Sequence, residues 1–454
     1  MDAGVALAVL VALLQKKQHG VPADASEDER RCAPSAPRAS GEHRPAKNKE
    51  GITVTDVTTD DARAAKLREG MVDELCDMEA IRSKSVAAAM AAVPRHLFVP
   101  DEPLESAYAA NNPVVVKRDG NGMALSSLSA AHIQAVMLEQ AEIEPGMRVL
   151  EIGSGGYNAA LMAELVSESG HVVSMDIDEE IVERARTCLH AAGYDRVTVV
   201  LADAEEGVPG TAPYDRILVT AGSWDIPPAW LEQLADDGRI VVPLRLKGAT
   251  RSIAFDRDGE ALVSRSYRLC GFVPFQGTGS HTERRVSLDD GVVLRLDDEA
   301  RQIDEAALRT ALHLPRIERW SGRAFDMPDE VELFLLTNDP DMAILHADEK
   351  HIAQELLPPS ASRGVPVLIS GDSFAYRTRR QNEETGGFES GVYAHGFSAD
   401  KVATRYVELL RRWADRHHRR GAACIRYIPK TAQASAPSTG FIPKRHGAVV
   451  VSWS

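Results

Sequence analysis

The chain has 454 residues, of which 44% are hydrophobic and 26% are charged, and its formal net charge at pH 7 is -15. This length predicts two or three domains, and the composition is typical of a soluble globular protein. The excess of acidic residues argues against a general nucleic-acid-binding protein, because such a chain repels phosphate groups.

An apolar run near the start of the chain, Ala3 to Leu14, is too short to span a bilayer. Asp2 precedes this run and Lys16 and Lys17 follow it, which is the reverse of the charge order in a secretory signal. We therefore expect neither export nor a membrane partner. The run is interpreted as a short frayed helix or as residues upstream of the true start.

The five cysteines are widely spaced and include no CxxC pair and no Cys/His cluster with zinc spacing: Cys32, Cys76, Cys188, Cys270 and Cys424. Reduced thiols in a cytoplasmic protein are the expectation. His417 and His418 have no partner at ligand spacing, so no metal site is predicted.

After the apolar run the sequence is polar as far as about Glu50, and residues 1–52 are therefore expected to form a disordered tail. Helical spacing of apolar residues begins after Asp60 or Asp61, either of which could cap a helix. A second helix is predicted over Ser85–Ala92.

From residue 147 onward short apolar strands alternate with helices. Strands are predicted at Arg148–Ile152, His171–Asp176, Val197–Leu201, Tyr214–Thr220 and Arg239–Pro243, with helices at Ala159–Val166, Glu179–Ala192 and Pro228–Leu234. Such alternation requires a parallel sheet covered by helices, so residues 53–280 are predicted to form a doubly wound, Rossmann-like α/β domain. Ser252–Phe255 and Ala261–Ser266 are expected to form an antiparallel hairpin.

The sequence changes in character beyond about Ser280, and residues 281–454 are predicted to form a separate α+β domain. Its expected elements are strands at Val331–Leu336, Val365–Ile369 and Cys424–Ile428 and a helix at Lys401–His418. We interpret this domain as a module for recognising a substrate or peptide.

A glycine-rich turn follows the first strand of the predicted α/β domain, over Val149–Ala160. Gly153, Ser154, Gly155 and Gly156 lie where the strand ends and a helix begins. Glycines let the backbone approach a ligand closely, and a helix N-terminus offers unpaired N–H groups. The pattern predicts a nucleotide-like ligand at the carboxyl end of this strand.

Two acids sharpen that prediction. Asp176 ends the second strand, where its carboxylate could accept ribose hydroxyls, and Asp203 follows the third strand near the expected adenine. This arrangement suits an adenosyl ligand without a diphosphate. A dinucleotide dehydrogenase is the alternative, although the G-S-G-G turn departs from G-x-G-x-x-G and no hydride-transfer constellation accompanies it.

Several segments in order resemble the protein-L-isoaspartate O-methyltransferases: Val93–Pro100, Ala107–Tyr108, Ser127–His132, Met137–Glu139, Val149–Ala160, Ala212–Ile217 and Gly238–Pro243. The resemblance spans roughly Lys66 to Gly277. It implies a methyltransferase that esterifies the side-chain carboxylate of an aspartyl or isoaspartyl residue in a protein or peptide, with S-adenosyl-L-methionine as cofactor.

The resemblance also implies roles for particular residues. The cofactor would be held by Glu151, Gly153, Ser154, Gly155, Gly156, Asp176 and Asp203. Ser129 would be the hydroxyl beside the substrate carboxylate and the transferred methyl group. His132 stands where the family often has histidine, and we interpret it as structural.

Three features depart from the family pattern: the glycine turn is one residue short of G-x-G-x-G-Y, Ala131 replaces a proline, and the segment after Ser280 is additional. With Asn112–Arg118 and Cys270–Gly277, the short turn resembles the actinobacterial "FxLD system" methyltransferases. That likeness implies modification of a ribosomally made, lanthipeptide-like precursor, where an esterified aspartate then forms a succinimide.

The expected chemistry needs no general base, because a carboxylate with a pKa of about 4 is already ionised at neutral pH. Repair of many damaged proteins and modification of one dedicated peptide are both compatible with it. The shortened glycine turn leaves open a different class, a cofactor- or peptide-binding protein without catalysis. The sequence sets neither the natural substrate nor the oligomeric state.

Other candidates carry simpler explanations. A basic group ends the predicted helix at Lys401–His418: Arg411, Arg412, Arg416, Arg419 and Arg420. Cations are favoured at a helix C-terminus, so a solvated helix end is expected, with docking of an acidic peptide leader as the alternative. Gly371-Asp372-Ser373 resembles a hydrolase nucleophile turn only weakly. Trp224 and Trp230 could line a substrate mouth or pack in the core.

Overall fold

The fold is described from a computed structural model, which places residues 54–120, 122–298, 300–325, 328–381, 388–432 and 440–453. The predicted tail at residues 1–52, with its apolar run and Cys32, lies outside the described residues. Among the described residues, Cys76, Cys188, Cys270 and Cys424 form no disulfide bond. No helix among the described residues is long and apolar enough to cross a membrane.

The chain divides into two compact units that interleave in sequence. Unit 1 comprises Met1–Ala221, Gln233–Val241 and Cys270–Val273, and unit 2 comprises Gly222–Glu232, Val242–Leu269 and Pro274–Ser454. The glycine-turn region, Val149–Ala160, therefore belongs to unit 1. The domain limits drawn from the sequence, 53–280 and 281–454, stay a prediction.

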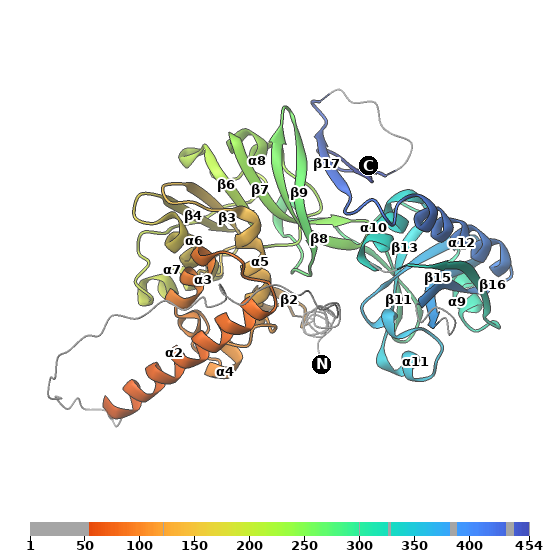
Figure 1. The fold of residues 1–454 in the computed structure, drawn as a ribbon, viewed down its shortest axis with the longest axis horizontal. Coiled ribbons are helices and arrows are strands. Elements are labelled where there is room, and N and C mark those ends of the chain that lie inside the picture. The colour runs from red at the N-terminus through yellow and green to blue at the C-terminus, as the bar shows by residue number, and fades with distance from the viewer. Residues whose placement is uncertain are drawn as a thin grey trace, which may run out of the picture. The chain divides into compact units, whose positions relative to one another are not determined.

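Unit 1 begins with a long helix and several shorter elements that precede the parallel sheet (Figure 1). These are α2 (Val54–Asp77), α3 (Lys84–Ala92), η1 (Arg95–Phe98), α4 (Leu104–Ala107), β1 (Val114–Arg118), β2 (Ala124–Leu128) and α5 (Ala131–Ala141). The first helix starts at Val54, so Asp60 and Asp61 lie inside it and do not cap it. No Gly or Pro interrupts the intervening residues, which explains why the helix extends further upstream than predicted.

The strands of unit 1 form a parallel sheet in the order β7-β6-β3-β4-β5. Its elements are β3 (Arg148–Ile152), α6 (Tyr157–Val166), β4 (His171–Asp176), α7 (Glu179–Ala191), β5 (Thr198–Leu201), η2 (Pro209–Thr211), β6 (Tyr214–Val219) and the first half of β7 (Leu234–Leu246). In chain order this is 3-2-1-4-5, the order of a Rossmann-like sheet. The predicted doubly wound α/β fold is confirmed.

The central strands are buried because their side chains are apolar on both faces. Val149, Leu150, Ile217 and Leu218 are fully inaccessible, which is the pattern of a strand covered on both sides. Because these strands are parallel, their carboxyl ends lie at the same edge of the sheet, where the turns after β3, β4 and β5 come together. That edge holds the candidate site.

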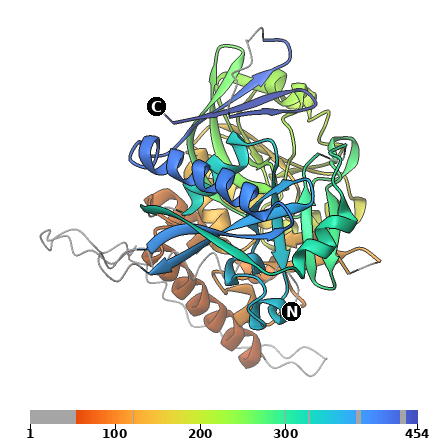
Figure 2. The same cartoon turned by 90° about the vertical axis from the view of Figure 1, so that its right-hand side faces the viewer.

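Unit 2 contains a seven-stranded antiparallel sheet in the order β10-β11-β13-β14-β15-β16-β12. Its strands are β10 (Arg284–Asp289), β11 (Val292–Leu296), β12 (Ile317–Ala324), β13 (Met342–Ala347), β14 (Val365–Ser370), β15 (Ser373–Gln381) and β16 (Phe388–Gly396). The helix α9 (Glu305–Leu312) packs on one face, and α12 (Ala399–Arg416) packs on the other, crossing the sheet in Figure 2.

The rest of unit 2 includes α8 (Pro228–Gln233, whose last residue belongs to unit 1), η3 (Gly277–Gly279), α10 (Pro328–Asn338), α11 (Glu349–Ala353) and η4 (Pro359–Ser362). A second group of strands pairs in the order β18-β19-β17-β9-β8, with bounds Phe441–Pro443, Gly447–Ser452, Cys424–Pro429, Ala261–Leu269 and Ala249–Asp258. The predicted hairpin is thus confirmed as β8 and β9, which are longer than expected.

One predicted strand is wrong. Val331–Leu336 lies in the helix α10, where Val331, Leu333, Phe334 and Leu335 are all fully buried. A helix buried on every side gives the same continuous apolar run as a buried strand, so periodicity could not separate them. Pro328 at the first helical position and acids in the first turn were the available signals for a helix.

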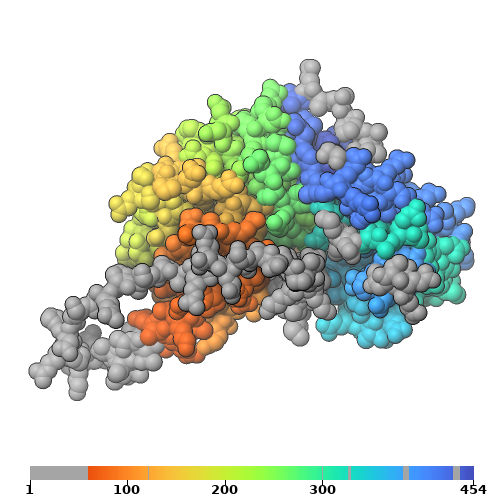
Figure 3. All heavy atoms as spheres, viewed as in Figure 1, coloured from red at the N-terminus to blue at the C-terminus, as the bar shows by residue number. Residues whose placement is uncertain are grey.

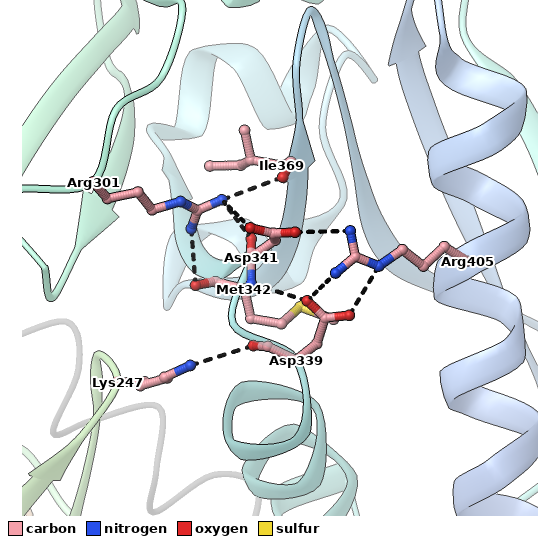
Figure 4. A network of polar contacts seen from close by, with 7 residues as sticks. All are labelled: Lys247, Arg301, Asp339, Asp341, Met342, Ile369 and Arg405. Atoms are coloured by element: carbon pink, nitrogen blue, oxygen red, sulfur yellow. Dashed lines mark hydrogen bonds and ion pairs between the residues drawn. The ribbon is translucent and has the colours of Figure 1, made fainter. Parts of the chain in front are cut away.

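Ion pairs fix α12 to the start of β13, as Figure 4 shows. The Arg405 guanidinium contacts Asp339 at 2.6 Å and Asp341 at 2.8 Å. Arg301 donates to the carbonyl oxygen of Asp341 at 2.9 Å, and Lys247 donates to that of Asp339 at 3.3 Å. These contacts give the middle of α12 a fixed register on the sheet.

Candidate functional site

The glycine turn begins directly after β3. Gly153 has a φ of +99° and its N–H donates to the Met175 carbonyl at 2.8 Å, which ties the turn to β4. Its own carbonyl accepts a hydrogen bond of 2.8 Å from the Thr220 hydroxyl, after β6. The turn is therefore held at both neighbouring strands, at the point where the strand order reverses.

Gly155 and Gly156 have different surroundings. A Cβ on Gly156 would lie 3.1 Å from the Phe98 ring and 3.4 Å from Ala185, and its φ is +79°. A Cβ on Gly155 would meet only Leu128, at 3.8 Å. Gly156 is thus required by packing and backbone conformation, whereas Gly155 leaves open space beside the turn.

Asp176, at the end of β4, faces the same turn. One carboxylate oxygen accepts the Ser154 N–H at 2.9 Å and the other accepts the Asp178 N–H at 3.0 Å. Burial raises the pKa of Asp176, while these backbone hydrogen bonds oppose the rise. Each oxygen keeps a lone pair, so the carboxylate can still accept two ligand hydroxyls.

Asp203 lies beside Asp176 across the sheet edge. The Ala202 N–H donates to the Asp176 carbonyl at 3.0 Å, so the chain leaving β5 stays next to the end of β4. The Asp203 carboxylate accepts the Glu205 N–H at 3.0 Å and is half-buried. The two acids that the sequence placed on successive strand ends are thus neighbours in space.

Glu151 is fully buried below the turn rather than at its surface. Its carboxylate accepts hydrogen bonds from Asn158 at 3.0 Å and from the Ser174 hydroxyl at 2.5 Å. Ser174 also contacts the Ser154 hydroxyl at 2.9 Å. Burial raises the pKa of Glu151 to about 7. In this position Glu151 supports the turn through Ser174 and Ser154.

Ser129 precedes α5 and is half-buried. Its carbonyl oxygen accepts a 2.7 Å hydrogen bond from Arg95, which is fully buried. Arg95 also donates to the Ala107 carbonyl at 2.7 Å and to Gln134 at 2.6 Å. Burial lowers the pKa of Arg95, and these three acceptors, two backbone carbonyls and a side-chain amide, are uncharged. The backbone at Ser129 is therefore positioned by a buried cation.

His132 is structural in its contacts. It is 2% exposed, its Nδ1 lies 3.2 Å from the Ala110 carbonyl, and burial lowers its pKa. Its backbone N–H donates to the same carbonyl at 3.0 Å. This agrees with the structural interpretation.

A small pocket opens beside the glycine turn. It is lined by Val116, Ser126, Leu128, Ser154, Gly155, Ile181, Arg184 and Ala185. The β1–β2 hairpin forms one wall. Lys117 of this hairpin contacts Asp178, the N-cap residue of α7, at 2.6 Å and Glu180 of α7 at 2.5 Å. Ser154 and Gly155 were predicted site residues, whereas Val116, Lys117 and Ser126 were not, because their position beside the turn depends on where the hairpin folds.

Ile177 is a further residue that the sequence did not single out. It follows Asp176 directly and is 39% exposed, although it is a large apolar side chain at the end of a buried strand. A flat apolar ring held near Asp176 would cover it and gain hydrophobic contact. The only sequence signal was its position next to the strand-end acid.

The remaining candidates lie in unit 2. Trp230 is fully buried and packs in the core, near Phe275. Trp224 stacks on His281 at 4.2 Å between ring centres, and the Lys444 ammonium lies 4.3 Å from its ring. Both tryptophans are therefore held by packing within unit 2.

The weak hydrolase motif is not a nucleophile turn. Ser373 is fully buried, donates to Asp372 at 2.7 Å, and accepts the Ser398 N–H at 2.8 Å. No histidine contact to Ser373 is found among the described residues. These bonds fix the start of α12.

Known proteins resemble one stretch of the chain, which includes most of unit 1 and part of unit 2. A family model described as Protein-L-isoaspartate(D-aspartate) O-methyltransferase (PCMT) matches residues 66–280. The chain is 42% identical to a protein-L-isoaspartate O-methyltransferase of Hyperthermus butylicus over 231 residues, which cover 48% of this chain and 92% of that protein. It is 40% identical to the Methanopyrus kandleri enzyme over 222 residues, covering 48% and 95%.

Solved structures give weaker likenesses. A protein-L-isoaspartate O-methyltransferase aligns with a TM-score of 0.45 and 23% identity, covering 79% of this chain and 96% of that one. A Plasmodium falciparum protein described as a putative member, in complex with S-adenosyl-L-homocysteine, aligns with a TM-score of 0.40 and 17% identity, covering 46% and 98%. Family membership follows from the sequence relatives alone.

The sheet order, the glycine turn and the strand-end acids define a Rossmann-like, S-adenosyl-L-methionine-dependent methyltransferase. The chain belongs to the protein-L-isoaspartate O-methyltransferase family, because it covers nine-tenths of relatives that are at least 40% identical. The predicted enzyme class and cofactor are confirmed. The residues of this chain fit that cofactor: Gly155 leaves space at the turn, and Asp176 keeps free acceptor positions.

Proposed function

We propose that this chain methylates the side-chain carboxylate of an aspartyl or isoaspartyl residue in a protein or peptide, at the edge of unit 1 where the glycine turn meets Ser129. The observation that carries the proposal is the approach of Leu128 to Gly155. Leu128 lines the pocket with Gly155, and Ser129 is the next residue. The residue predicted to contact the substrate thus adjoins the turn predicted to hold the cofactor.

Bound S-adenosyl-L-methionine supplies an electrophilic methyl group on a sulfonium. The substrate carboxylate is ionised at neutral pH, so its oxygen forms the new bond to carbon as the carbon–sulfur bond breaks, and no proton has to move. The chain's contribution is then to orient the two reactants and exclude water, which contributes up to roughly 7–11 kcal/mol to lowering the barrier.

Each site residue has a proposed role. Asp176 accepts the ribose hydroxyls, and Asp203 lies at the adenine end. Gly153, Gly155 and Gly156 shape the turn, and Glu151 with Ser154 supports it from below. Ser129 donates a hydrogen bond that orients the substrate carboxylate.

The methyl ester makes the acyl carbon electrophilic, so the following backbone nitrogen can close a succinimide ring and release methanol. This closure is a property of the esterified peptide and requires no further group from the chain. Formation of a succinimide would be seen in a mass spectrum as the loss of methanol from the methyl ester.

About half of this chain lies outside the match to its relatives. The match covers almost the whole length of each relative. Broad repair of damaged proteins gives no reason for an additional folded unit of this size. This favours a dedicated substrate, such as a lanthipeptide-like precursor, as the resemblance to the "FxLD system" methyltransferases implies.

The test compares isoaspartyl and aspartyl forms of one synthetic peptide, incubated with the full-length protein and S-adenosyl-L-methionine. Mass spectrometry should show a methyl gain or the later succinimide in one form, and none without cofactor. Calorimetric binding of the cofactor without transfer to either form would support the non-catalytic alternative instead.

A further inference from the structure

A group of exposed arginines lies at one end of the seven-stranded sheet in unit 2. It extends beyond the basic helix end seen in the sequence to two strands of the sheet. We call it the arginine surface, and its members are Arg323, Arg379, Arg411, Arg412, Arg416, Arg419 and Arg420. The helix α12, which carries three of them, lies at the molecular surface in Figure 3.

Direct contacts place β12 against the C-terminal half of α12. Arg323 of β12 pairs with Asp415 of α12 at 2.8 Å, and Arg411 of α12 donates to the Ser321 carbonyl at 2.9 Å. Phe325, just after β12, lies 6.3 Å from the His418 ring. Arginines from the strand and the helix therefore share one surface.

The strand β15 adds a cation to the same face. Arg377 lies 5.6 Å from the Phe325 ring, on the side of the sheet that α12 covers. Side chains two residues apart on a strand point to the same face, so Arg379 continues that side beyond Arg377. The Arg379 guanidinium lies 4.7 Å from the ring of Phe388, which is 42% exposed.

Among the described residues, few acids pair with the arginines of this surface. Asp415 pairs with Arg323, but Arg412, Arg416, Arg419 and Arg420 form no ion pair within the part of the chain that the structure describes. The positive charges of Arg420, Arg416 and Arg412 lower the pKa of His417, after the larger effect of burial. A helix C-terminus favours cations within its last turn, which accounts for Arg416 but not for Arg323 or Arg379.

From this arrangement we infer that the arginine surface docks an acidic, extended segment of the peptide substrate, outside the residue that is methylated. The inference rests on the proposed function, since it assumes a peptide substrate. Complementary charge supports it: in a chain of net charge -15 an exposed cluster of seven arginines attracts carboxylates, and Phe388 offers an apolar contact beside them.

The experiment uses the full-length protein and two isoaspartyl peptides that differ only in a flanking segment, glutamate-rich in one and glutamine-rich in the other. Methylation rates are measured for the wild type, for Arg412→Glu/Arg416→Glu and for the conservative Arg412→Lys/Arg416→Lys. A matched control, Arg285→Glu/Lys350→Glu, makes the same charge change on β10, at the opposite edge of the sheet, and on α11.

The wild type should have a KM about tenfold lower for the glutamate-rich peptide at low salt, with a similar kcat for both peptides. The charge reversal should abolish this preference, whereas the lysine variant and the control should keep it. Raising the salt concentration should shrink the preference in the wild type. Equal KM values in the wild type, or equal losses in the reversal and the control, would overturn the inference.

A binding measurement separates this inference from the proposed function. Fluorescence anisotropy of a labelled glutamate-rich peptide, with no aspartyl residue, reports docking whether or not any methyl group is transferred. Binding that the charge reversal removes supports the surface even if no peptide is methylated. If a single-stranded oligonucleotide of equal charge binds more tightly than the peptide, the assigned partner is wrong.

Discussion

The guanidinium of Arg95 donates a 2.7 Å hydrogen bond to the carbonyl oxygen of Ser129, and the same cation lies 4.8 Å from the ring of Tyr157, the first residue of α6. Ser129 is the residue proposed to contact the substrate carboxylate, and α6 begins directly after the glycine turn. One buried cation thus connects the two halves of the proposed site.

Replacing Arg95 with Met should remove that connection. The carbonyls of Ala107 and Ser129 would lose their donor in a buried position, which should cost about 2–4 kcal/mol of unfolding free energy. Chemical denaturation checks this value. If the variant folds with an unchanged free energy of unfolding, Arg95 does not hold these segments together.

Ser129→Ala should slow methyl transfer at least about tenfold and leave cofactor affinity nearly unchanged, because its hydroxyl is proposed to touch only the substrate carboxylate. Steady-state rates with an isoaspartyl peptide and calorimetry with S-adenosyl-L-homocysteine give the two readings. Ser127→Ala, two residues earlier, is the control and should retain activity. Equal loss of turnover and cofactor binding in Ser129→Ala would refute the proposed role.

The adjacent glycines of the turn should respond differently to alanine. Gly156→Ala forces a Cβ against the Phe98 ring at a φ of +79°, so it should lower the free energy of unfolding by at least about 2 kcal/mol. Gly155→Ala has space at 3.8 Å and should fold normally but weaken binding of S-adenosyl-L-homocysteine. Similar losses of unfolding free energy in both variants would mean that Gly155 and Gly156 do not differ in packing as described.

The raised pKa of Glu151 should make the free energy of unfolding depend on pH. Its pKa is about 7 in the folded chain and 4.5 ordinarily, so the folded state holds the proton more tightly than the unfolded state. Its contribution is full below pH 4.5 and is lost as pH rises to 7, by roughly 3 kcal/mol. Glu151→Gln should therefore be more stable than the wild type at pH 8 but not at pH 4. A pH-independent difference in denaturation would contradict this.

Asp176→Asn should weaken binding of S-adenosyl-L-homocysteine by about ten- to a hundredfold. The amide of asparagine would present a donor where the Ser154 or Asp178 N–H now donates, and it would lose acceptor capacity for ribose hydroxyls. Calorimetric titration measures the change. The wild type should show no comparable affinity for a nicotinamide dinucleotide, and tight binding of one would revive the dehydrogenase alternative.

Much of unit 1 could be predicted because local pattern and burial agree there. The strands at Arg148–Ile152 and His171–Asp176 have the predicted limits, since each has an apolar centre and is bounded by turns. The glycine turn and Asp176 come together because successive parallel strands end at one sheet edge. No long-range information was needed for that juxtaposition.

Other features depend on contacts that a linear pattern does not contain. Lys117 lies at the pocket wall only because the β1–β2 hairpin folds against the start of α7. Arg95 donates a hydrogen bond to Ser129, which is thirty-four positions away in the sequence. Val331–Leu336 is predicted as a strand but lies in the helix α10. Its apolar side chains are buried on all sides, so they show no helical periodicity in the sequence. The arginine surface likewise needs Arg323 and Arg379, which strand pairing brings to the end of α12.

The most direct test of the whole account is transfer of a radiolabelled methyl group from S-adenosyl-L-methionine to an isoaspartyl peptide by the full-length protein. The label should appear in the peptide as a base-labile ester, and the transfer should fall sharply in Asp176→Asn and Ser129→Ala. A protein that binds the cofactor yet labels no aspartyl or isoaspartyl peptide would contradict the account.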